Sequence, residues 1–446
     1  MCYVFPPQMK PSPDRKVFEL LEDDRDFSIL SEASFCALGW DLPDGGYRVS
    51  AIAGAAAGGA FDPRTLETVP ANALGYRAQW HVVGYEYYGL AWDITGLHLL
   101  PTESEPGLPT LAIINGGSAN WYEFFLDPLN QAGLGQYLAQ RIPIMLITIP
   151  GNYTVGGWTE TNFKERIPGY LIGKPVSTED ARIRNAVFTF SLVAEGVRQL
   201  LERATAGPLL ILGHSTASEF QFRLNNSSLK TRLGGRSIGW GTGAPGALVR
   251  EYDEKFGIRA DRVAGLGRYP PVDLLRSRDS EGYVSSNYVG PWNPLSGSSP
   301  LEVANAWFRN ESRRRPQFKQ TLQDMEQKGF VEHRAQLEKE IRDALAGNQY
   351  GVKPTEVIED LFSESALCAS GYQRMAWVVG KLDDRQWNRS SEKARELFYA
   401  RRFRQENPNA VIRILLIDAP LTHYGHIERP RQLAAVLLET IRWMMQ

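Results

Sequence analysis

Six short apolar runs, spread along the chain, constrain its fold more than any other feature of the sequence. They read LPTLAIING, RIPIMLITIPG, GPLLILGHS, GRSIGWGTG, YQRMAWVVG and AVIRILLID, and each ends near a glycine or a polar residue. Apolar and polar positions do not alternate within them. Runs of this kind are typical of strands that are buried on both faces of a parallel sheet.

Helical segments separate several of these runs, as ARIRNAVFTFSLVAEGVRQLLERA does before GPLLILG. Such alternation predicts the α/β class, with a mostly parallel, doubly wound sheet. Upstream, AQWHVVGYEYYGLAWDITGLHLL has the character of paired strands joined by a turn. The closing segment RPRQLAAVLLETIRWMM predicts a helix that packs on the sheet, with Pro430 in its first turn. Its apolar face consists of Leu433, Val436, Leu437, Ile441 and Met444.

The region between about residues 246 and 370 interrupts this rhythm, because it contains no strongly buried strand. It holds loops rich in Pro, Gly and Ser and charged helical segments, in which Glu338 and Arg342 have the spacing of an i,i+4 pair on a solvated helix face. We therefore predict an N-terminal extension over 1–45, a core in two parts over 46–245 and 371–446, and a helical cap inserted over 246–370.

Charge and composition exclude several classes of partner. The chain has 446 residues, with 49 basic and 51 acidic side chains and a formal charge of −2, which gives no electrostatic reason to expect nucleic acid or an anionic membrane surface as a partner. Three scattered cysteines do not form a disulfide framework or a zinc cluster. The N-terminus lacks the apolar stretch of a signal peptide, so we expect a cytoplasmic protein. Homo-oligomer formation stays open.

The third run leads into a lone serine between small residues, GHSTA at 213–217. A strand, a glycine, a serine and a helix form the nucleophile-elbow pattern, in which a tight turn exposes the serine Oγ at the carboxyl edge of the sheet. The turn requires small residues on both sides, and Gly213 and Ala217 meet this demand. The N-terminus of the next helix favours negative charge there. By itself the pentapeptide also fits an ordinary Gly-Ser turn.

A serine nucleophile also needs oxyanion donors, a base and an acid. The segment NGGS at 115–118 follows a buried run, and its glycines let backbone N–H groups approach an oxyanion. Asp383 follows the run MAWVVG, and His423 lies in the loop after RILLID. The order Ser215, Asp383, His423 is the one expected of this architecture.

These elements together resemble the α/β-hydrolase superfamily. The resemblance rests on NGGS at 115–118, GHSTA at 213–217, GKLD at 380–383 and HYGHIERP at 423–430, and it covers residues 80–245 and 371–446. It implies that Ser215 attacks a carbonyl carbon, that His423 transfers the proton and that Asp383 orients the imidazole. The N–H groups of Gly117 and Thr216 would bind the oxyanion.

This sequence departs from the family's pattern at two points that bear on function. Asn115 replaces the histidine that is frequent in the oxyanion segment, which affects the anchoring of the loop more than the chemistry. The nucleophile is a serine, and this argues against the dehalogenase and epoxide hydrolase branches of the superfamily, because those enzymes need a carboxylate there.

Neighbouring residues compete for some of these roles. His426 is the rival of His423, but the matched ending favours the first histidine as the base and has the second packing near the terminal helix. The Gly-x-x-Asp spacing favours Asp383 over Asp384, and Asp418 lies too near the histidine loop. His214 is interpreted as a packing or hydrogen-bonding residue. The H-x-x-H spacing lacks a third zinc ligand, so no metal is predicted.

The stretch GTGAPG at 241–246 fits the G-x-G-x-x-G pattern of dinucleotide sites. Such a site also wants an acidic residue at the end of the next strand, and about twenty residues further on there is only Asp261, with no clear strand before it. We therefore predict no organic cofactor.

Aromatic residues gather near the expected mouth of the site and predict an apolar pocket for a small-molecule substrate: Trp121, Tyr122, Tyr153, Trp158 and Trp240. The sequence thus predicts a serine hydrolase that cleaves a carboxylic ester or lactone of a moderately bulky, apolar small molecule. Amide, thioester and carbon–carbon bond hydrolysis use the same residues, and a ligand receptor on the same fold is the non-enzymatic alternative.

Overall fold

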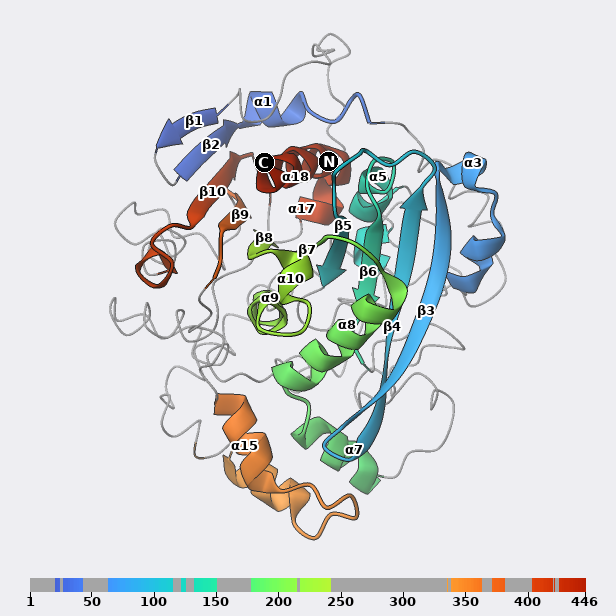
Figure 1. Ribbon diagram of the computed structural model, residues 1–446, viewed down its shortest axis with the longest axis vertical. Helices are drawn as coiled ribbons and strands as arrows, with labels where there is room; N and C mark the ends of the chain where they lie inside the picture. Colours follow the sequence, from blue (N-terminus) through green and yellow to red (C-terminus); the bar gives the residue numbers. More distant parts are fainter. Residues whose placement is uncertain are drawn as a thin grey trace, which may run out of the picture.

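The computed structural model describes residues 21–24, 27–42, 63–114, 122–125, 132–150, 178–214, 217–241, 335, 338–362, 371–381, 403–419, 421 and 425–446 (Figure 1). Everything below refers to these residues.

One ten-stranded sheet organises the described residues, in the order β1-β2-β10-β9-β8-β7-β5-β6-β4-β3. Its strands are β1 (Leu21–Asp24), β2 (Phe27–Ser31), β3 (Tyr76–Tyr87), β4 (Leu90–Pro101), β5 (Thr110–Ile114), β6 (Ile144–Thr148), β7 (Leu209–His214), β8 (Arg236–Trp240), β9 (Arg374–Gly380) and β10 (Val411–Asp418). Neighbouring strands in the run β2-β10-β9-β8-β7-β5-β6 pair in parallel. The pairs β1–β2, β4–β6 and β3–β4 are antiparallel. The predicted α/β class and mostly parallel sheet are confirmed.

The six apolar runs of the sequence form the six strands from β5 to β10. Every residue of β5, β6 and β7 is buried, because helices cover both faces of the sheet at these positions. Burial on both faces explains why the runs show no alternation of apolar and polar residues.

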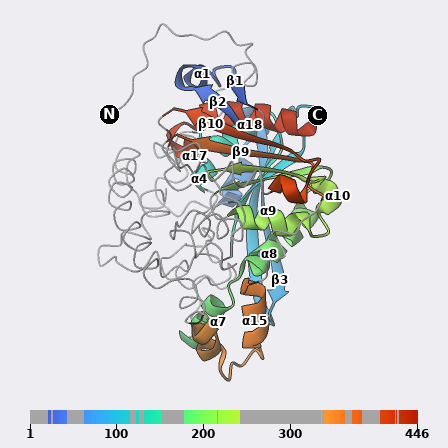
Figure 2. The same ribbon diagram turned by 90° about the vertical axis from the view of Figure 1, so that its left-hand side faces the viewer.

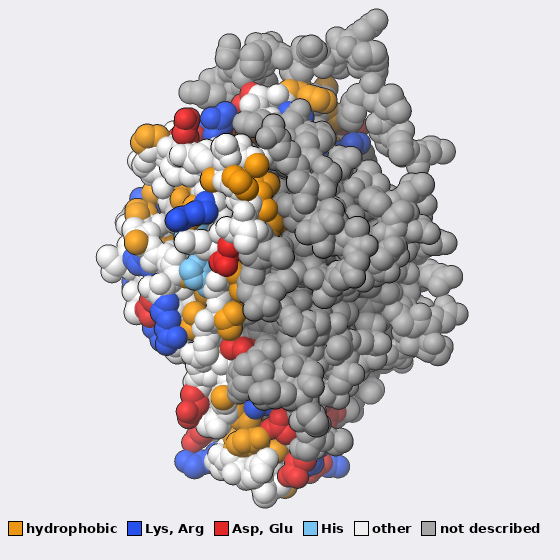
Figure 3. Space-filling view, turned by 90° about the vertical axis from the view of Figure 1, so that its right-hand side faces the viewer, with side chains coloured by type: hydrophobic (Ala, Val, Ile, Leu, Met, Phe, Trp, Pro, Cys, Tyr) orange, Lys and Arg blue, Asp and Glu red, His pale blue; other side chains and the backbone are white. Residues whose placement is uncertain are grey.

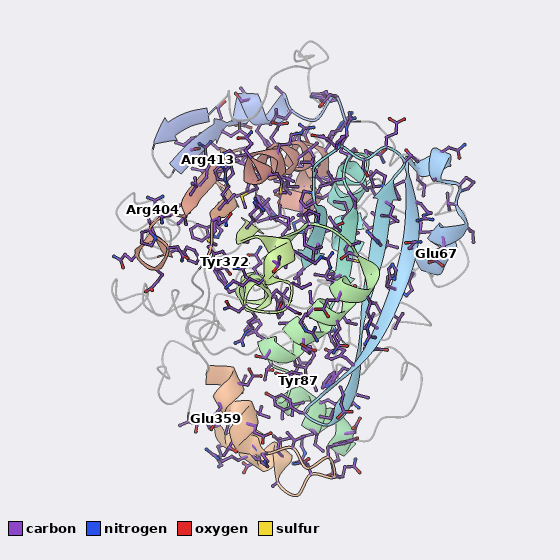
Figure 4. All side chains as sticks on the ribbon, in the orientation of Figure 1. Glu67, Tyr87, Glu359, Tyr372, Arg404 and Arg413 are labelled. Atoms are coloured by element: carbon purple, nitrogen blue, oxygen red, sulfur yellow. The ribbon has the colours of Figure 1, made fainter. Side chains whose placement is uncertain are left out.

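The antiparallel hairpin of β3 and β4 confirms the paired strands expected upstream. Its two-residue turn consists of Tyr88 and Gly89, whose φ angles are +54° and +68°. Positive φ at both central residues is the backbone of a type I′ turn, whose twist matches that of the flanking strands. Figure 4 shows Tyr87 close to this end of the hairpin.

Helices lie on both faces of the sheet and divide the core into two hydrophobic clusters. One face carries α5 (Leu134–Leu138) and α18 (Pro430–Met445), and we call it the α18 face. The other, the α8 face, carries α8 (Phe190–Ala204), α9 (Ser218–Asn225), residues 338–345 and α15 (Pro354–Phe362). Figure 1 shows α8 crossing in front of the sheet. The remaining elements are α1 (Glu32–Cys36), the 3-10 helix η3 (Pro63–Thr68), α3 (Ala71–Leu74), α4 (Tyr122–Phe125), α7 (Thr178–Ala186), α10 (Lys230–Leu233) and α17 (Gly425–Glu428).

The closing helix behaves as predicted. In α18 Pro430 stands in the first turn, and the five apolar residues of the predicted face are fully buried in the cluster of the α18 face. The helical segment before β7 divides into α7 and α8, because Thr189 caps α8 by accepting a hydrogen bond from the N–H of Leu192 at 3.1 Å.

Two regions add to what the sequence predicts. Within the N-terminal extension, β2 pairs in parallel with β10 and β1 pairs with β2, so this region widens the sheet. Within the predicted cap, residues 338–362 pack into the cluster of the α8 face through Ile341, Leu345, Val357 and Leu361. The Arg342 guanidinium lies 3.4 Å from the Glu338 carboxylate, as the i,i+4 spacing predicts.

The described surface agrees with the balanced charge of the sequence. On the face seen in Figure 3, basic and acidic side chains are interspersed with hydrophobic ones. Among the described residues, no helix combines the length and the apolar character needed to cross a bilayer.

Candidate active site

The candidate site lies at the carboxyl edge of the parallel strands. Ile114 at the end of β5 is in register with Gly213 of β7, and His214 is in register with Trp240 at the end of β8. Gly380 at the end of β9 pairs with Ile417 of β10. Parallel strands present their carboxyl ends at one edge, and ligands of open α/β sheets bind outside that edge.

The end of β7 and the start of α9 approach each other closely in space. β7 ends at His214 and α9 begins at Ser218, and Ser215 and Thr216 between them lie outside the described residues. A Cβ added to Gly213 would lie 3.1 Å from the backbone carbon and oxygen of Ala217 and 3.0 Å from the Gln221 side chain. The chain therefore approaches itself closely on the two sides of Ser215, and any side chain at residue 213 would press against Ala217 and Gln221.

The segments that precede Asp383 and His423 meet at the ends of β9 and β10. A Cβ added to Gly380 would lie 2.6 Å from the Leu421 carbonyl oxygen. The backbone of β9 thus ends against Leu421, two residues before His423. Asp383 and His423 themselves lie outside the described residues.

Asp418, a rival for the role of the acid, has an ion-pair partner. Its Oδ1 lies 2.5 Å from the Nζ of Lys381, and both side chains are partly exposed. The N–H of Lys381 donates to the carbonyl oxygen of Ile417 at 3.0 Å, which joins the ends of the two strands. Asp418 is therefore engaged in holding the β9 and β10 ends together.

The predicted oxyanion segment and most of the predicted aromatic contacts lie outside the described residues: Gly117, Trp121, Tyr153 and Trp158. Tyr122 begins α4, and nothing of its side chain is described. The helix α4 is well anchored at its end. The carbonyl oxygen of Phe125 accepts from the Gln136 side-chain amide at 2.6 Å, and Gln136 in turn accepts from the Tyr76 hydroxyl at 2.7 Å.

Trp240 is the predicted aromatic residue whose side chain the structure describes. The exposed fraction of its side chain is 0 %, and its Nε1–H donates to the Nδ1 of His426 at 3.1 Å. Trp240 thus packs in the hydrophobic cluster of the α18 face at the end of β8. Its contact with substrate stays a prediction.

A buried aromatic cluster surrounds this hydrogen bond, and sequence reasoning did not find it. It consists of Phe124, His214, Trp240 and His426. The ring of His426 stacks on Phe124 with centroids 4.4 Å apart, and it meets the ring of His214 edge-on at 4.5 Å. The signal in the sequence is that His214 and Trp240 each end an apolar run. In a parallel sheet, such positions lie side by side.

The described residues contain no group of three or more His, Cys, Asp or Glu side chains that could hold a metal ion. Of the G-x-G-x-x-G stretch, Gly241 is described, and its N–H donates to the carbonyl oxygen of Val378 at 3.0 Å. Residues 242–246 lie outside the described part of the chain.

No protein-family model and no curated protein matches the sequence. Among solved structures, a variant of VrEH2 is similar with a TM-score of 0.42 at 11% identity, covering 81% of this chain and 98% of that chain. A thermophilic esterase from Thermogutta terrifontis gives a TM-score of 0.40 at 13% identity, covering 83% and 100%. Brefeldin A esterase, described as a bacterial homologue of human hormone sensitive lipase, gives 0.33 at 14% identity, covering 91% and 85%.

The architecture of the chain itself defines its fold. The sheet is mostly parallel, helices cover both faces, and the helix α9 begins four residues after the end of β7 at the carboxyl edge. This is the α/β-hydrolase fold that the sequence motifs predict.

Proposed function

We propose that this protein is a serine hydrolase that cleaves a carboxylic ester or lactone of a moderately bulky, apolar small molecule. Ser215 Oγ attacks the carbonyl carbon while His423 takes its proton, and the N–H groups of Gly117 and Thr216 bind the oxyanion. The C–O bond to the alcohol then breaks, and His423 gives the proton to the leaving oxygen. Water cleaves the acyl-enzyme by the same steps, and Asp383 stabilises the imidazolium.

The observation that carries this proposal is the close approach of Gly213 and Ala217 on the two sides of Ser215. An ordinary Gly-Ser turn does not need a buried strand before the serine and a helix within three residues after it. Here β7 is buried along its whole length and α9 begins at Ser218. This is the local structure in which a serine hydroxyl is presented at the edge of a sheet.

The ends of the neighbouring strands support the rest of the predicted triad. Asp383 follows Gly380 by three residues, and His423 follows Leu421 by two. The backbone at Gly380 packs against Leu421, and Gly380 and Leu421 are the described residues that precede Asp383 and His423, which supports assigning both to one site. The oxyanion segment likewise follows β5, which pairs directly with β7.

We infer the moderate size and apolar character of the substrate from the aromatic residues predicted near the site and from the predicted cap. The cap is proposed to exclude water and to supply specificity. The packing of residues 338–362 against the α8 face gives the cap a fixed attachment at its C-terminal end. A cytoplasmic location and the absence of a cofactor stay predictions.

Turnover of a chromogenic ester by the wild-type chain and by Ser215→Ala tests the proposal. We expect a burst of alcohol release followed by steady turnover in the wild type, and a loss of at least about 10⁴-fold in kcat in the variant. An anilide, a thioester and a vinylogous diketone of the same acyl group, assayed in parallel, identify the bond that is cleaved. Equal turnover by the wild type and the variant would refute the proposal, and binding of the ester without turnover would indicate a ligand receptor.

A further inference from the structure

The buried aromatic cluster of Phe124, His214, Trp240 and His426 joins residues next to the predicted oxyanion segment, nucleophile and base. His214 directly precedes Ser215, and His426 follows His423 by three residues. Phe124 lies on α4, after the oxyanion segment, and Trp240 ends the neighbouring strand β8. Figure 2 shows α4 and α17 close to each other beside β9. All four side chains are buried.

One directional interaction fixes the histidine of this cluster. The Nε1–H of Trp240 donates to the Nδ1 of His426 at 3.1 Å. Indole nitrogen can only donate, so Nδ1 acts as the acceptor, and the proton of the neutral imidazole is on Nε2. The stacking on Phe124, with an interplanar angle of 10°, fixes the plane of the same ring. The rotation and the tautomer of His426 are thereby both determined.

The described residues on the two sides of His423 in the sequence, Leu421 and Gly425, both make close contacts. Before it, Leu421 packs against the backbone at Gly380. After it, the backbone at Gly425 packs against the indole of Trp240, where an added Cβ would lie 2.6 Å from Cζ2. Trp240 therefore contacts two consecutive residues just beyond the predicted base, one by van der Waals contact and one by the hydrogen bond.

We propose that Trp240 and His426 are positioning residues for the predicted catalytic base: their hydrogen bond fixes the described residues that directly follow the base in the chain, and through them the base acts at Ser215. This inference rests on the proposed function. In this inference Trp240 acts through His426 in place of the predicted substrate contact, because its indole is fully buried. Loss of the hydrogen bond should therefore lower kcat and the rate of Ser215 modification at an unchanged KM.

The variants are chosen to separate the hydrogen bond from packing. Trp240→Phe removes the N–H donor and keeps an aromatic ring. His426→Asn keeps an acceptor near the position of Nδ1, whereas His426→Leu has nearly the same size and no acceptor. Tyr85→Phe is the matched control, because it removes one buried donor, the hydroxyl that bonds to the Leu192 carbonyl oxygen at 3.1 Å, on the opposite face of the sheet.

The experiment measures kcat and KM with the chromogenic ester, and the rate constant of Ser215 labelling by a fluorophosphonate. We expect Trp240→Phe and His426→Leu each to lower kcat and the labelling rate about tenfold or more, with KM within about twofold. His426→Asn should recover most of the loss, and Tyr85→Phe should match the wild type. The double variant Trp240→Phe/His426→Leu should be no slower than the slower single variant, because both remove one bond.

Two results overturn the inference. One is a folded Trp240→Phe variant with wild-type kcat and labelling rate; the other is a His426→Asn variant as slow as His426→Leu. If His426→Leu does not fold, Trp240→Phe and His426→Asn still decide between positioning and packing, because Trp240→Phe should then be slow and His426→Asn near wild type. A wild-type chain in which the fluorophosphonate leaves Ser215 unmodified refutes the proposed function as well, whereas labelling that is equal in all variants refutes the positioning role alone.

Discussion

The ion pairs that join separate elements on the two faces of the sheet differ in how deeply they are buried. On the α18 face the ion pair of Glu105 and Arg442 lies at the surface, with about a third of each side chain exposed. On the α8 face the carboxylate of Asp360 is largely buried and accepts from the hydroxyls of Tyr88 and Thr189 at 2.7 Å each. It also accepts from the Ser191 hydroxyl and lies 3.7 Å from the Arg223 guanidinium.

This difference shows where the fold depends on specific polar contacts. The α18 face is covered by the helix α18, whose buried side is mostly apolar. The α8 face must also hold α15, part of the predicted cap, and it does so through Asp360, which joins α15 to the β3–β4 hairpin, to α8 and to α9. Substitution of the buried Asp360 should therefore cost much more than substitution of the exposed Glu105.

The largest effect is expected at Asp360. Asp360→Ala leaves Arg223 and three hydroxyls without their common acceptor, and removing one partner of a buried charged group is strongly destabilising. We expect the free energy of unfolding, measured with urea, to fall by about 4 kcal/mol. The matched control is Glu359→Ala, the exposed neighbour on α15 (Figure 4), which should change it by less than about 0.5 kcal/mol. Equal effects of the two substitutions would show that the buried contacts of Asp360 do not stabilise the fold.

The next largest effect concerns pH and His98 on β4. His98 is 5 % exposed, and neither ring nitrogen has a hydrogen-bond partner among the described residues. Burial, with smaller contributions from His81 and Arg77, lowers the pKa of His98 to about 4, below its ordinary value of 6.5. The unfolded chain therefore binds a proton at higher pH than the folded chain does, and stability falls as pH drops from 6.5 to 4.

The loss over this window should reach about 3 kcal/mol from this group, at 1.36 kcal/mol per pKa unit. Urea unfolding of the wild type and His98→Leu at pH 7, 5.5 and 4 measures it. The substitution should remove this part of the pH dependence, so the difference between the two proteins changes with pH. A difference that stays constant from pH 7 to pH 4 would show that folding does not lower the pKa of His98.

The third largest effect on stability is expected at Gly213, near the carboxyl end of β7. Gly213→Ala places a methyl group 3.0–3.1 Å from Ala217 and Gln221, so the turn that carries Ser215 must shift. We expect a loss of about 2 kcal/mol in unfolding free energy, in the range of overpacking, together with a large loss of ester turnover. At Gly84 on β3 an added Cβ would meet only the Trp92 carbonyl oxygen at 3.9 Å, so Gly84→Ala should keep stability and turnover. Wild-type turnover by Gly213→Ala would show that the close approach is not required.

The smallest effect belongs to the α18 face. Hydrogen bonds from Arg442 lower the pKa of the Glu105 carboxyl, yet the pair is open to water. Glu105→Gln should therefore cost only about 0.5 kcal/mol in urea unfolding at neutral pH, and less in high salt. A cost as large as that of Asp360→Ala would contradict the comparison between the faces.

The parts of the fold that could be predicted are those whose signal is local. The runs that became β5 to β10 are apolar throughout because both of their faces are covered, and Pro430 with five apolar positions marks α18. The strand β1, with the sequence LEDD, carries no apolar pattern, and its place follows from the pairing of β2 with the edge of β10. Sequence position alone does not reveal such an edge.

The same distinction applies to the candidate site. The close approach of Gly213 and Ala217 could be predicted, because the two residues are close in sequence as well as in space. The hydrogen bond between Trp240 and His426 spans 186 residues, and the one between Tyr88 and Asp360 spans 272. Contacts of that kind depend on the register of the sheet and on helix packing, neither of which a single sequence contains.

Mass spectrometry of the chain after reaction with a fluorophosphonate tests the central claim most directly, because it reports on the serine itself. The account predicts one adduct, on the peptide that contains Ser215, which is absent from Ser215→Ala and forms much more slowly in His423→Gln. An unmodified Ser215 in a folded, ester-cleaving chain, or an adduct on another residue that survives Ser215→Ala, would contradict it.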